Sequence, residues 1–141
     1  MPIIKRETDY ALRALTRLAL AGESLPVSAL AEGEDVPPEF LRKIMQRLNQ
    51  AGIVKSSQGP FGGYRLARPA RQVSALDVIE AVQGPLVMNE CISNPKICRR
   101  IDSCPFRRRL SALEAGLNSN LAKVRISDAA REIQSAQETA R

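Results

Sequence analysis

The sequence predicts a mainly α-helical protein: a winged helix-turn-helix domain with a small β-hairpin wing, followed by a long C-terminal helix. Apolar residues recur at three- and four-residue steps along most of the chain, which is the spacing of amphipathic helices. Two short helical stretches separated by a turn occupy residues 26–51, and a glycine-rich hairpin follows them directly. Helix, helix, turn, helix and hairpin is the order of a winged helix.

Three helices are expected before the hairpin. The first covers 8–21 with Thr8 as its N-cap, and the second covers 28–34 with Ser28 as its N-cap, because these side chains accept hydrogen bonds from the first turn. The third covers 38–50 and begins with a proline, whose missing N–H costs nothing there. In a winged helix this third helix enters the major groove of DNA.

The outer face of the helix over 38–50 is the first candidate binding surface. Its apolar residues form the buried stripe, so the polar residues between them face outward. Arginine and lysine suit guanine, glutamine suits adenine, and glutamate can accept a hydrogen bond from cytosine. Taken alone, the same face could simply be solvated, and the hairpin that follows favours DNA. The expected DNA-contacting residues on this helix are Glu39, Arg42, Lys43 and Gln46.

The hairpin is the second candidate binding surface. Strands over 53–56 and 64–66 flank a tip, 59–63, which holds three glycines and a proline and is therefore either a tight turn or a flexible tip. Cationic and small polar groups around such a tip can approach phosphates, and a glutamine can enter the minor groove. The expected DNA-contacting residues of the hairpin are Lys55, Gln58, Gly62 and Arg65.

Three more helices are expected beyond the hairpin. Ser74 caps one that runs to about residue 83, a long one begins at Pro105, and Ser127 caps the last one. A polar stretch with all three cysteines separates the first two. The chain is therefore expected to divide into a winged helix-turn-helix DNA-binding domain (1–86), a cysteine loop (87–104) that is a candidate site for a metal or cluster, and a helical arm (105–141).

The composition narrows the classes of function. The chain has 21 Lys and Arg against 15 Asp and Glu, and this net charge of +6 suits a polyanion such as double-stranded DNA, although anionic membranes attract it too. No apolar run reaches the roughly 18 residues of a membrane span, and the first residues lack a secretory pattern. We therefore expect a cytoplasmic protein with no membrane partner. Without histidine, a nucleophile–base pair or a phosphate loop, an enzyme is not expected.

The three cysteines, Cys91, Cys98 and Cys104, are the candidate metal ligands. Six residues separate the first two and five separate the last two. Buried structural cysteines normally lie in apolar segments, so a core role is disfavoured in this polar stretch. Thiolates bind soft iron, and flanking arginines and a helix start at Pro105 favour the thiolate form. Zinc sites usually pair cysteines more closely, but chemistry alone leaves an iron–sulfur cluster, zinc and a simple thiol switch open.

Five segments carry a family resemblance: Thr8–Leu15, Phe40–Ile44, Gly52–Val54, Gly59–Leu66 and Leu76–Pro85. They resemble the Rrf2 family of winged-helix transcription regulators over about residues 3–125, and the Gly-Pro-x-Gly-Gly-Tyr motif is specific to the wing. The resemblance implies a homodimer that binds a palindromic operator. It also implies that residues 105–141 are a helical dimerisation arm, in which the long C-terminal helix from Pro105 is the dimerisation helix and packs against its mate. Arg42, Gln58 and the pair Pro37–Pro38 depart from the family's iron–sulfur-assembly branch, so the operator is expected to be its own.

The resemblance also implies the cofactor, because three cysteines at this position ligate an iron–sulfur cluster in the family. A 2Fe-2S or 4Fe-4S cluster is therefore expected here. One branch takes its fourth ligand from a histidine, which this chain lacks. Another takes an aspartate from the N-terminal helix of the partner subunit, and Asp9 occupies that position. Asp9 is equally well explained as an ordinary acid in a first helical turn, and Glu7 and Glu90 are weaker candidates.

These expectations combine into a homodimeric repressor whose affinity for DNA is switched by an iron–sulfur cluster that senses iron, redox state or nitric oxide. A ligand from the other subunit would tie the first helix to the dimer arm, so loss of the cluster would change the spacing of the recognition helices. Two alternatives remain. One is a DNA-binding regulator with a thiol or zinc switch, and the other is an iron–sulfur electron carrier or cluster-transfer protein.

Overall fold

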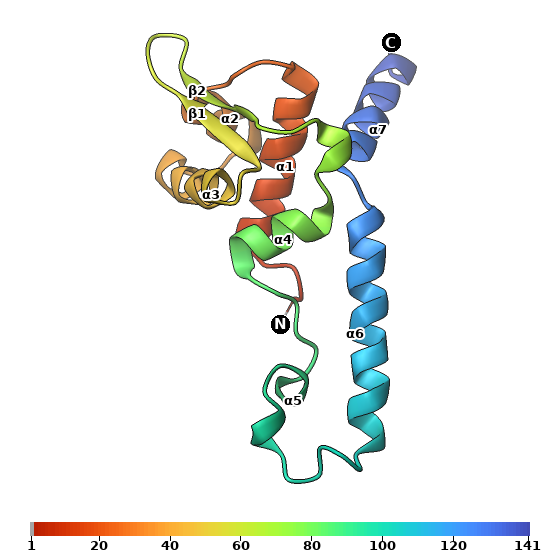
Figure 1. The fold of residues 1–141 in the computed structure, drawn as a ribbon. Helices are drawn as coiled ribbons and strands as arrows, with labels where there is room; N and C mark the ends of the chain where they lie inside the picture. Colours follow the sequence, from red (N-terminus) through yellow and green to blue (C-terminus); the bar gives the residue numbers. More distant parts are fainter. Residues whose placement is uncertain (1) are drawn as a thin grey trace.

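The computed structural model describes residues 2–141 and has the predicted fold class, a winged helix-turn-helix domain followed by helices (Figure 1). Figure 1 shows α1 inside the domain, α3 and the hairpin on one side of it, and α6 running from the segment near α5 back towards α7. The elements are α1 (Arg6–Ala21), α2 (Val27–Glu34), α3 (Pro38–Gln50), β1 (Val54–Ser57), β2 (Gly63–Leu66), η1 (Ala70–Gln72), α4 (Ala75–Gln83), α5 (Glu90–Ser93), η2 (Pro95–Ile97), α6 (Pro105–Lys123) and α7 (Ile126–Thr139).

The core forms around α1, whose apolar residues follow helical spacing. Leu15 and Leu18 are almost completely buried and belong to one cluster with the inner faces of α2, α3 and α4. Each large aliphatic side chain removed from water contributes about 1.5–3 kcal/mol. The same burial orients α3, because Leu41, Ile44 and Leu48 face the core and the polar residues between them must face out.

The observed helix starts can be compared with the N-caps predicted from the sequence. Ser74 is the N-cap of α4: its Oγ accepts a hydrogen bond from the Asp77 N–H (3.0 Å), and the Asp77 carboxylate accepts one from the Ser74 N–H (2.9 Å). The predictions at Thr8, Ser28 and Ser127 are wrong, since α1, α2 and α7 begin before these residues. None of the three has an acidic residue three positions later, so the reciprocal pair that fixes Ser74 cannot form.

The wing is an antiparallel hairpin whose strands match the predicted ones to within one residue at each end. Its register places Lys55 opposite Arg65. The segment before α2 joins the hairpin, because the Leu25 N–H donates to the Tyr64 carbonyl and the Tyr64 N–H donates to the Leu25 carbonyl, both at 2.9 Å. Gly63 permits this approach, since a side chain there would clash with the Leu25 carbonyl oxygen.

The two C-terminal helices lie differently on the domain. α6 buries none of its described residues, whereas α7 turns back against α1 and buries Ile126 and Ala130. Backbone hydrogen bonds fix the turn between them: the Ala75 N–H donates to the Val124 carbonyl (2.8 Å), and the Ile126 N–H donates to the Val73 carbonyl (3.0 Å). The chain therefore leaves the domain after α4, returns along α6, and ends with α7 packed against α1 of the domain.

Candidate nucleic-acid interface and cysteine segment

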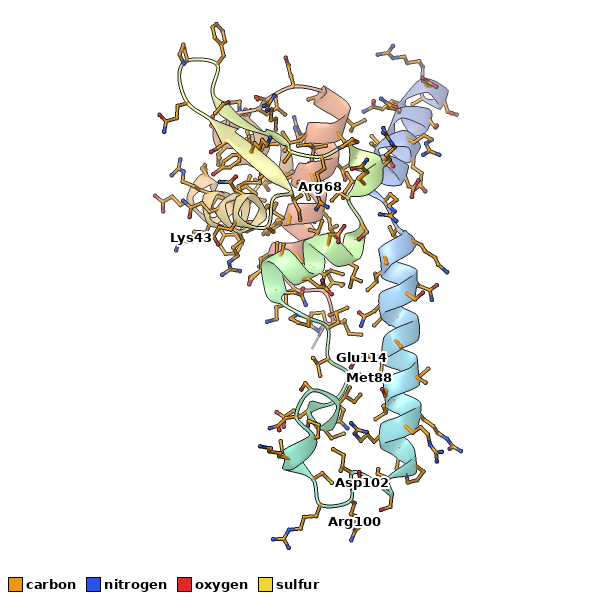
Figure 2. The ribbon with its side chains drawn as sticks, viewed as in Figure 1. Lys43, Arg68, Met88, Arg100, Asp102 and Glu114 are labelled. Atoms are coloured by element: carbon orange, nitrogen blue, oxygen red, sulfur yellow. The ribbon has the colours of Figure 1, made fainter. Side chains whose placement is uncertain are left out.

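The outer face of α3 carries the four residues expected to contact bases, Glu39, Arg42, Lys43 and Gln46. All four are exposed, and their three- and four-residue spacing places them on one side of the helix. Within residues 2–141, none of them takes part in an ion pair or a side-chain hydrogen bond. Figure 2 shows Lys43 pointing away from the domain. The structure therefore presents these side chains together to a ligand in solution.

Arg47 lies on the same helix, but it is engaged by the protein itself. Its Nη1 donates a hydrogen bond to the Val82 carbonyl oxygen (2.9 Å) and lies 4.0 Å from the Glu7 carboxylate. Arg47 thus joins α3 to the end of α4 and to the start of α1. Sequence patterns alone do not reveal this role, and the only local signal is that Arg47 precedes the buried Leu48, at the border between the polar and apolar faces of α3.

Two cations stand directly opposite each other on the wing. Lys55 and Arg65 are cross-strand partners, so their side chains project from the same face of the hairpin, and both are exposed. Like charges in this position destabilise a hairpin by a few tenths of a kcal/mol to about 1 kcal/mol. A bound phosphate would convert this repulsion into attraction. Figure 1 shows the hairpin and α3 on the same side of the domain, away from α7.

The tip of the wing holds the other two predicted contacts. Gln58 is exposed at the end of β1 and is free to reach a ligand. Gly62 has a structural reason to be glycine, because a Cβ there would lie only 2.5 Å from the Ser57 carbonyl oxygen. Its N–H donates to the Gly59 carbonyl oxygen (2.9 Å) and closes the turn. The tip is therefore a tight turn, which is one of the two forms expected from the sequence.

The cysteine segment is tied to α6 at two points. The Met88 N–H donates to the Glu114 carboxylate (2.7 Å), and Arg107 Nε donates to the Cys91 carbonyl oxygen (3.2 Å). Figure 2 shows Met88 and Glu114 adjacent to each other where the segment leaves the domain. A displacement of this segment relative to α6 must break or carry along these two hydrogen bonds.

The three cysteines are free thiols in different surroundings. Cys91 in α5 and Cys104 at the N-cap of α6 are half-buried, and Cys98 is exposed. Among residues 2–141, no three Cys, Asp or Glu side chains are grouped closely enough to hold a metal ion. The donor chemistry still fits an iron–sulfur cluster, because thiolates bind soft iron and Cys104 lies at the positive end of a 19-residue helix. The single chain carries these ligands without bringing them together.

Asp9, the predicted fourth ligand, lies in the first half of α1 and forms an ion pair with Arg13. This hydrogen bond and the carboxylate charge raise the pKa of Arg13 above its ordinary value. The two side chains are each 48% exposed, so the pair contributes little to stability and is easily exchanged for another partner. The structure does not group Asp9 with the cysteines of the same chain.

Comparison with known proteins decides the family. The Rrf2 family model, described as an iron-dependent transcriptional regulator, matches residues 4–132. The chain belongs to the Rrf2 family. It is 36% identical over 118 residues to protein aau3 of Rhizobium meliloti, a match that covers 82% of the chain and 75% of that protein. It is also 36% identical over 78 residues to the HTH-type transcriptional regulator IscR of Cereibacter sphaeroides, covering 52% of the chain and 50% of IscR.

The fold of this Rrf2 protein is shared with solved structures. CymR, the global cysteine regulator of B. subtilis, superposes with a TM-score of 0.76 at 24% identity, over 94% of the chain and 98% of CymR. The chain spans about half the length of several curated relatives that it matches. Those relatives are transcription regulators rather than enzymes, and this Rrf2 chain is a DNA-binding regulator too. No helix within residues 2–141 is long and apolar enough to cross a membrane.

Proposed function

We propose that this Rrf2 regulator is a cytoplasmic homodimeric repressor that reads a palindromic operator, and that its affinity for DNA depends on an iron–sulfur cluster at Cys91, Cys98 and Cys104. DNA binding is supported chiefly by one observation: Lys55 and Arg65 are like-charged cross-strand partners on the wing, beside the exposed polar face of α3. A folded hairpin gains nothing from two opposed cations unless an anion lies between or above them.

On α3, the side chains suit base edges in the major groove. Arg42 and Lys43 can donate to guanine O6 and N7, Gln46 can form a bidentate pair with adenine, and Glu39 can accept from the amino group of cytosine. They stand on a helix whose opposite face is fixed by the core, so their backbone positions are already set before DNA binds. These four residues therefore determine the base preference of the half-site.

On the wing, Lys55 and Arg65 contact the phosphates that flank the half-site, and Gln58 reaches the minor groove. Contacts to phosphates fix the register of the domain on the duplex and carry no sequence information themselves. The wing therefore supplies much of the affinity, while α3 supplies most of the discrimination.

The homodimer rests on the unpartnered apolar strip of α6. Phe106 (70% exposed) and Leu113 (61% exposed) lie on the same side of α6, seven residues apart, and Val124 (51% exposed) follows at the C-cap of the helix. A 19-residue amphipathic helix is stabilised mainly by burial of its apolar face, and no described residue of α6 is fully buried by the single chain. Packing α6 against its copy covers this strip. Two-fold symmetry then presents two α3 helices to a palindromic site.

The cysteine segment is the proposed input of the switch. When bound, an iron–sulfur cluster supplies a group whose integrity depends on iron, oxygen and nitric oxide. The three thiolates would hold it, with Asp9 of the partner's α1 as the fourth ligand. Drawing the thiolates together displaces the segment between α4 and α6, where Met88 and Cys91 are hydrogen-bonded to α6. Arg47 links the end of α4 to α3, so this displacement reaches the recognition helix.

Anaerobic purification of the full chain tests the cluster directly. We expect iron, acid-labile sulfide and visible absorbance in the wild-type protein, all lost in Cys98→Ala and all retained in Ser93→Ala, which changes an exposed hydroxyl in the same segment. The affinities of the loaded and iron-free forms for the gene's own upstream DNA should differ by about 5- to 150-fold, the usual range of coupling between two sites. A colourless, iron-free wild-type protein would contradict the cluster.

A thiol or zinc switch is the second candidate, and the exposure of Cys98 favours it because an accessible thiol can be oxidised without unfolding. This candidate requires zinc in the purified protein, or a disulfide after mild oxidation with diamide. Elemental analysis and mass spectrometry of the same preparation distinguish it from the cluster, and neither outcome affects the DNA-binding surface.

A further inference from the structure

Phe61, at the tip of the wing, is the most exposed large apolar side chain of those described, with 93% of its surface accessible. It is separated from the hydrophobic core by the length of the hairpin, and no neighbouring side chain covers it. The other strongly exposed aromatic residue, Phe106, belongs to the apolar strip of α6 and has a proposed partner there. Phe61 therefore needs a separate explanation.

The turn that carries Phe61 is stiff. The Gly62 N–H donates to the Gly59 carbonyl oxygen (2.9 Å), and Gly62 packs so tightly on the Ser57 carbonyl that no side chain fits. Pro60, the residue before Phe61, further restricts the backbone. The base of the hairpin is held by the paired strands and by Leu25. An aromatic ring is thus displayed on a preorganised support, which reduces the entropy lost when it binds.

The charges around Phe61 indicate what it meets. Lys55 and Arg65 are opposed on one face of the same hairpin and direct it to phosphates, so the tip lies beyond the phosphate line, at a groove. An apolar ring gains nothing against phosphates. In the minor groove, by contrast, phenylalanine and proline side chains can wedge against a base step and partially unstack it. We propose that Phe61 enters the minor groove beside each half-site as such an apolar wedge.

This proposal rests on the DNA-binding function and adds to it a contact that reads deformability of the duplex rather than base edges. Pyrimidine–purine steps unstack most easily, so a wedge at the tip selects flexible steps at positions that α3 never touches. Gln58, three residues before Phe61 at the start of the same tip, then contacts the floor of the opened groove.

Affinity and its salt dependence test the contact. The probe is a duplex that the wild-type protein selects from a random pool. We expect Phe61→Ala to bind it about tenfold more weakly, as for loss of one stacked aromatic contact. The slope of log affinity against log salt should not change, because Phe61 neutralises no phosphate. Lys55→Ala is the matched control on the same hairpin, and it should reduce the slope by about one unit.

Fluorescence of 2-aminopurine, placed at the flanking step of the same duplex, tests the unstacking itself. The signal should rise when the wild-type protein binds, rise in part with Phe61→Leu, and stay unchanged with Phe61→Ala. All three proteins should unfold at the same temperature, since a side chain that is 93% exposed contributes little to the fold. If Phe61→Ala binds with wild-type affinity and wild-type fluorescence change, Phe61 does not act as a wedge and the proposal is wrong. If the wild type selects no duplex, DNA binding itself fails.

Discussion

Gly63 illustrates how one residue holds the wing in place. Its φ of 148° is a conformation that side chains other than glycine rarely adopt, and its Cα faces the Leu25 carbonyl oxygen at a distance that excludes a Cβ. Tyr64, the next residue, exchanges two backbone hydrogen bonds with Leu25. The glycine-rich motif of the wing therefore has two structural roles: it forms the turn, and it allows the hairpin to pack against the segment before α2.

Gly63→Ala should consequently damage the wing without touching any DNA-contacting side chain. We expect the free energy of unfolding to fall by about 2 kcal/mol, the usual cost of a strained backbone conformation, together with weaker DNA binding. Ser56→Ala, an exposed change in the facing strand, should stay within about 0.5 kcal/mol of the wild type. Urea denaturation at one fixed protein concentration measures both. Equal stability of the two variants would show that Leu25 yields to a side chain.

Recognition helix α3 shows how an element combines two tasks. Its apolar face is fixed by the core, and its polar face carries side chains that have no partner among residues 2–141, yet Arg47 is bound to Val82 and Glu7. Arg42 and Arg47 are therefore the same residue type on the same helix with different roles. One is free to contact DNA, and the other orients the helix.

Replacing each arginine by methionine separates these roles, because methionine keeps the length of the apolar stem. Arg47→Met should lower the free energy of unfolding by about 1 kcal/mol, the worth of a lost hydrogen bond, and weaken binding to all duplexes alike. Arg42→Met should leave stability within about 0.5 kcal/mol and change the preferred base at one position of each half-site. Selection from a random pool and denaturation of both variants check this. Identical selected sequences for Arg42→Met and wild type would contradict the role of Arg42.

Sequence patterns predicted the elements well wherever a local rule decides them. Helical spacing located α3 and its buried face, and the glycine-rich tip located the hairpin. The sequence predicts both Ser74 and Thr8 as N-caps, but only Ser74 is one. The side chain of Thr8 is fully buried, and its hydroxyl donates to the Gln83 amide oxygen at 2.7 Å, a contact between residues 75 positions apart. The acid three residues after Ser74 is the local signal that separates the two cases.

The candidate site could likewise be predicted only where local sequence rules decide the structure. The polar face of α3 and the cations of the wing follow from helix spacing and strand alternation, so their exposure could be predicted. The hydrogen bond from Arg47 to the Val82 carbonyl could not be predicted, because the two residues are 35 positions apart in the sequence. The geometry around the cysteines could not be predicted either. It depends on how a polar segment with few contacts is arranged, and a ligand from a second subunit would act there.

At the scale of the whole molecule, the proposed homodimer requires that the exposed strip of α6 be covered by its copy, so that two α3 helices act together. Leu113→Glu places a charge in this strip and should convert the dimer into monomers, since burying an unpaired charge is strongly unfavourable. Ala115→Glu, which adds the same charge to the opposite side of α6, should remain dimeric. Sedimentation velocity distinguishes the two. A monomeric wild-type protein, or a dimeric Leu113→Glu, would contradict the α6 interface.

The cysteine segment should respond to iron as a unit, because its few hydrogen bonds to α6 leave most of it exposed. Arg99 and Arg100 lie in this exposed stretch, so trypsin should cut the iron-free chain there first (Figure 2). Anaerobic reconstitution with iron and sulfide should slow this cleavage at least tenfold, since ligation of Cys91, Cys98 and Cys104 closes the stretch from both sides. Cys98→Ser should show no such protection. Mass spectrometry of the fragments follows the cut, and equal cleavage rates with and without iron would mean that the cysteines do not gather around a cluster.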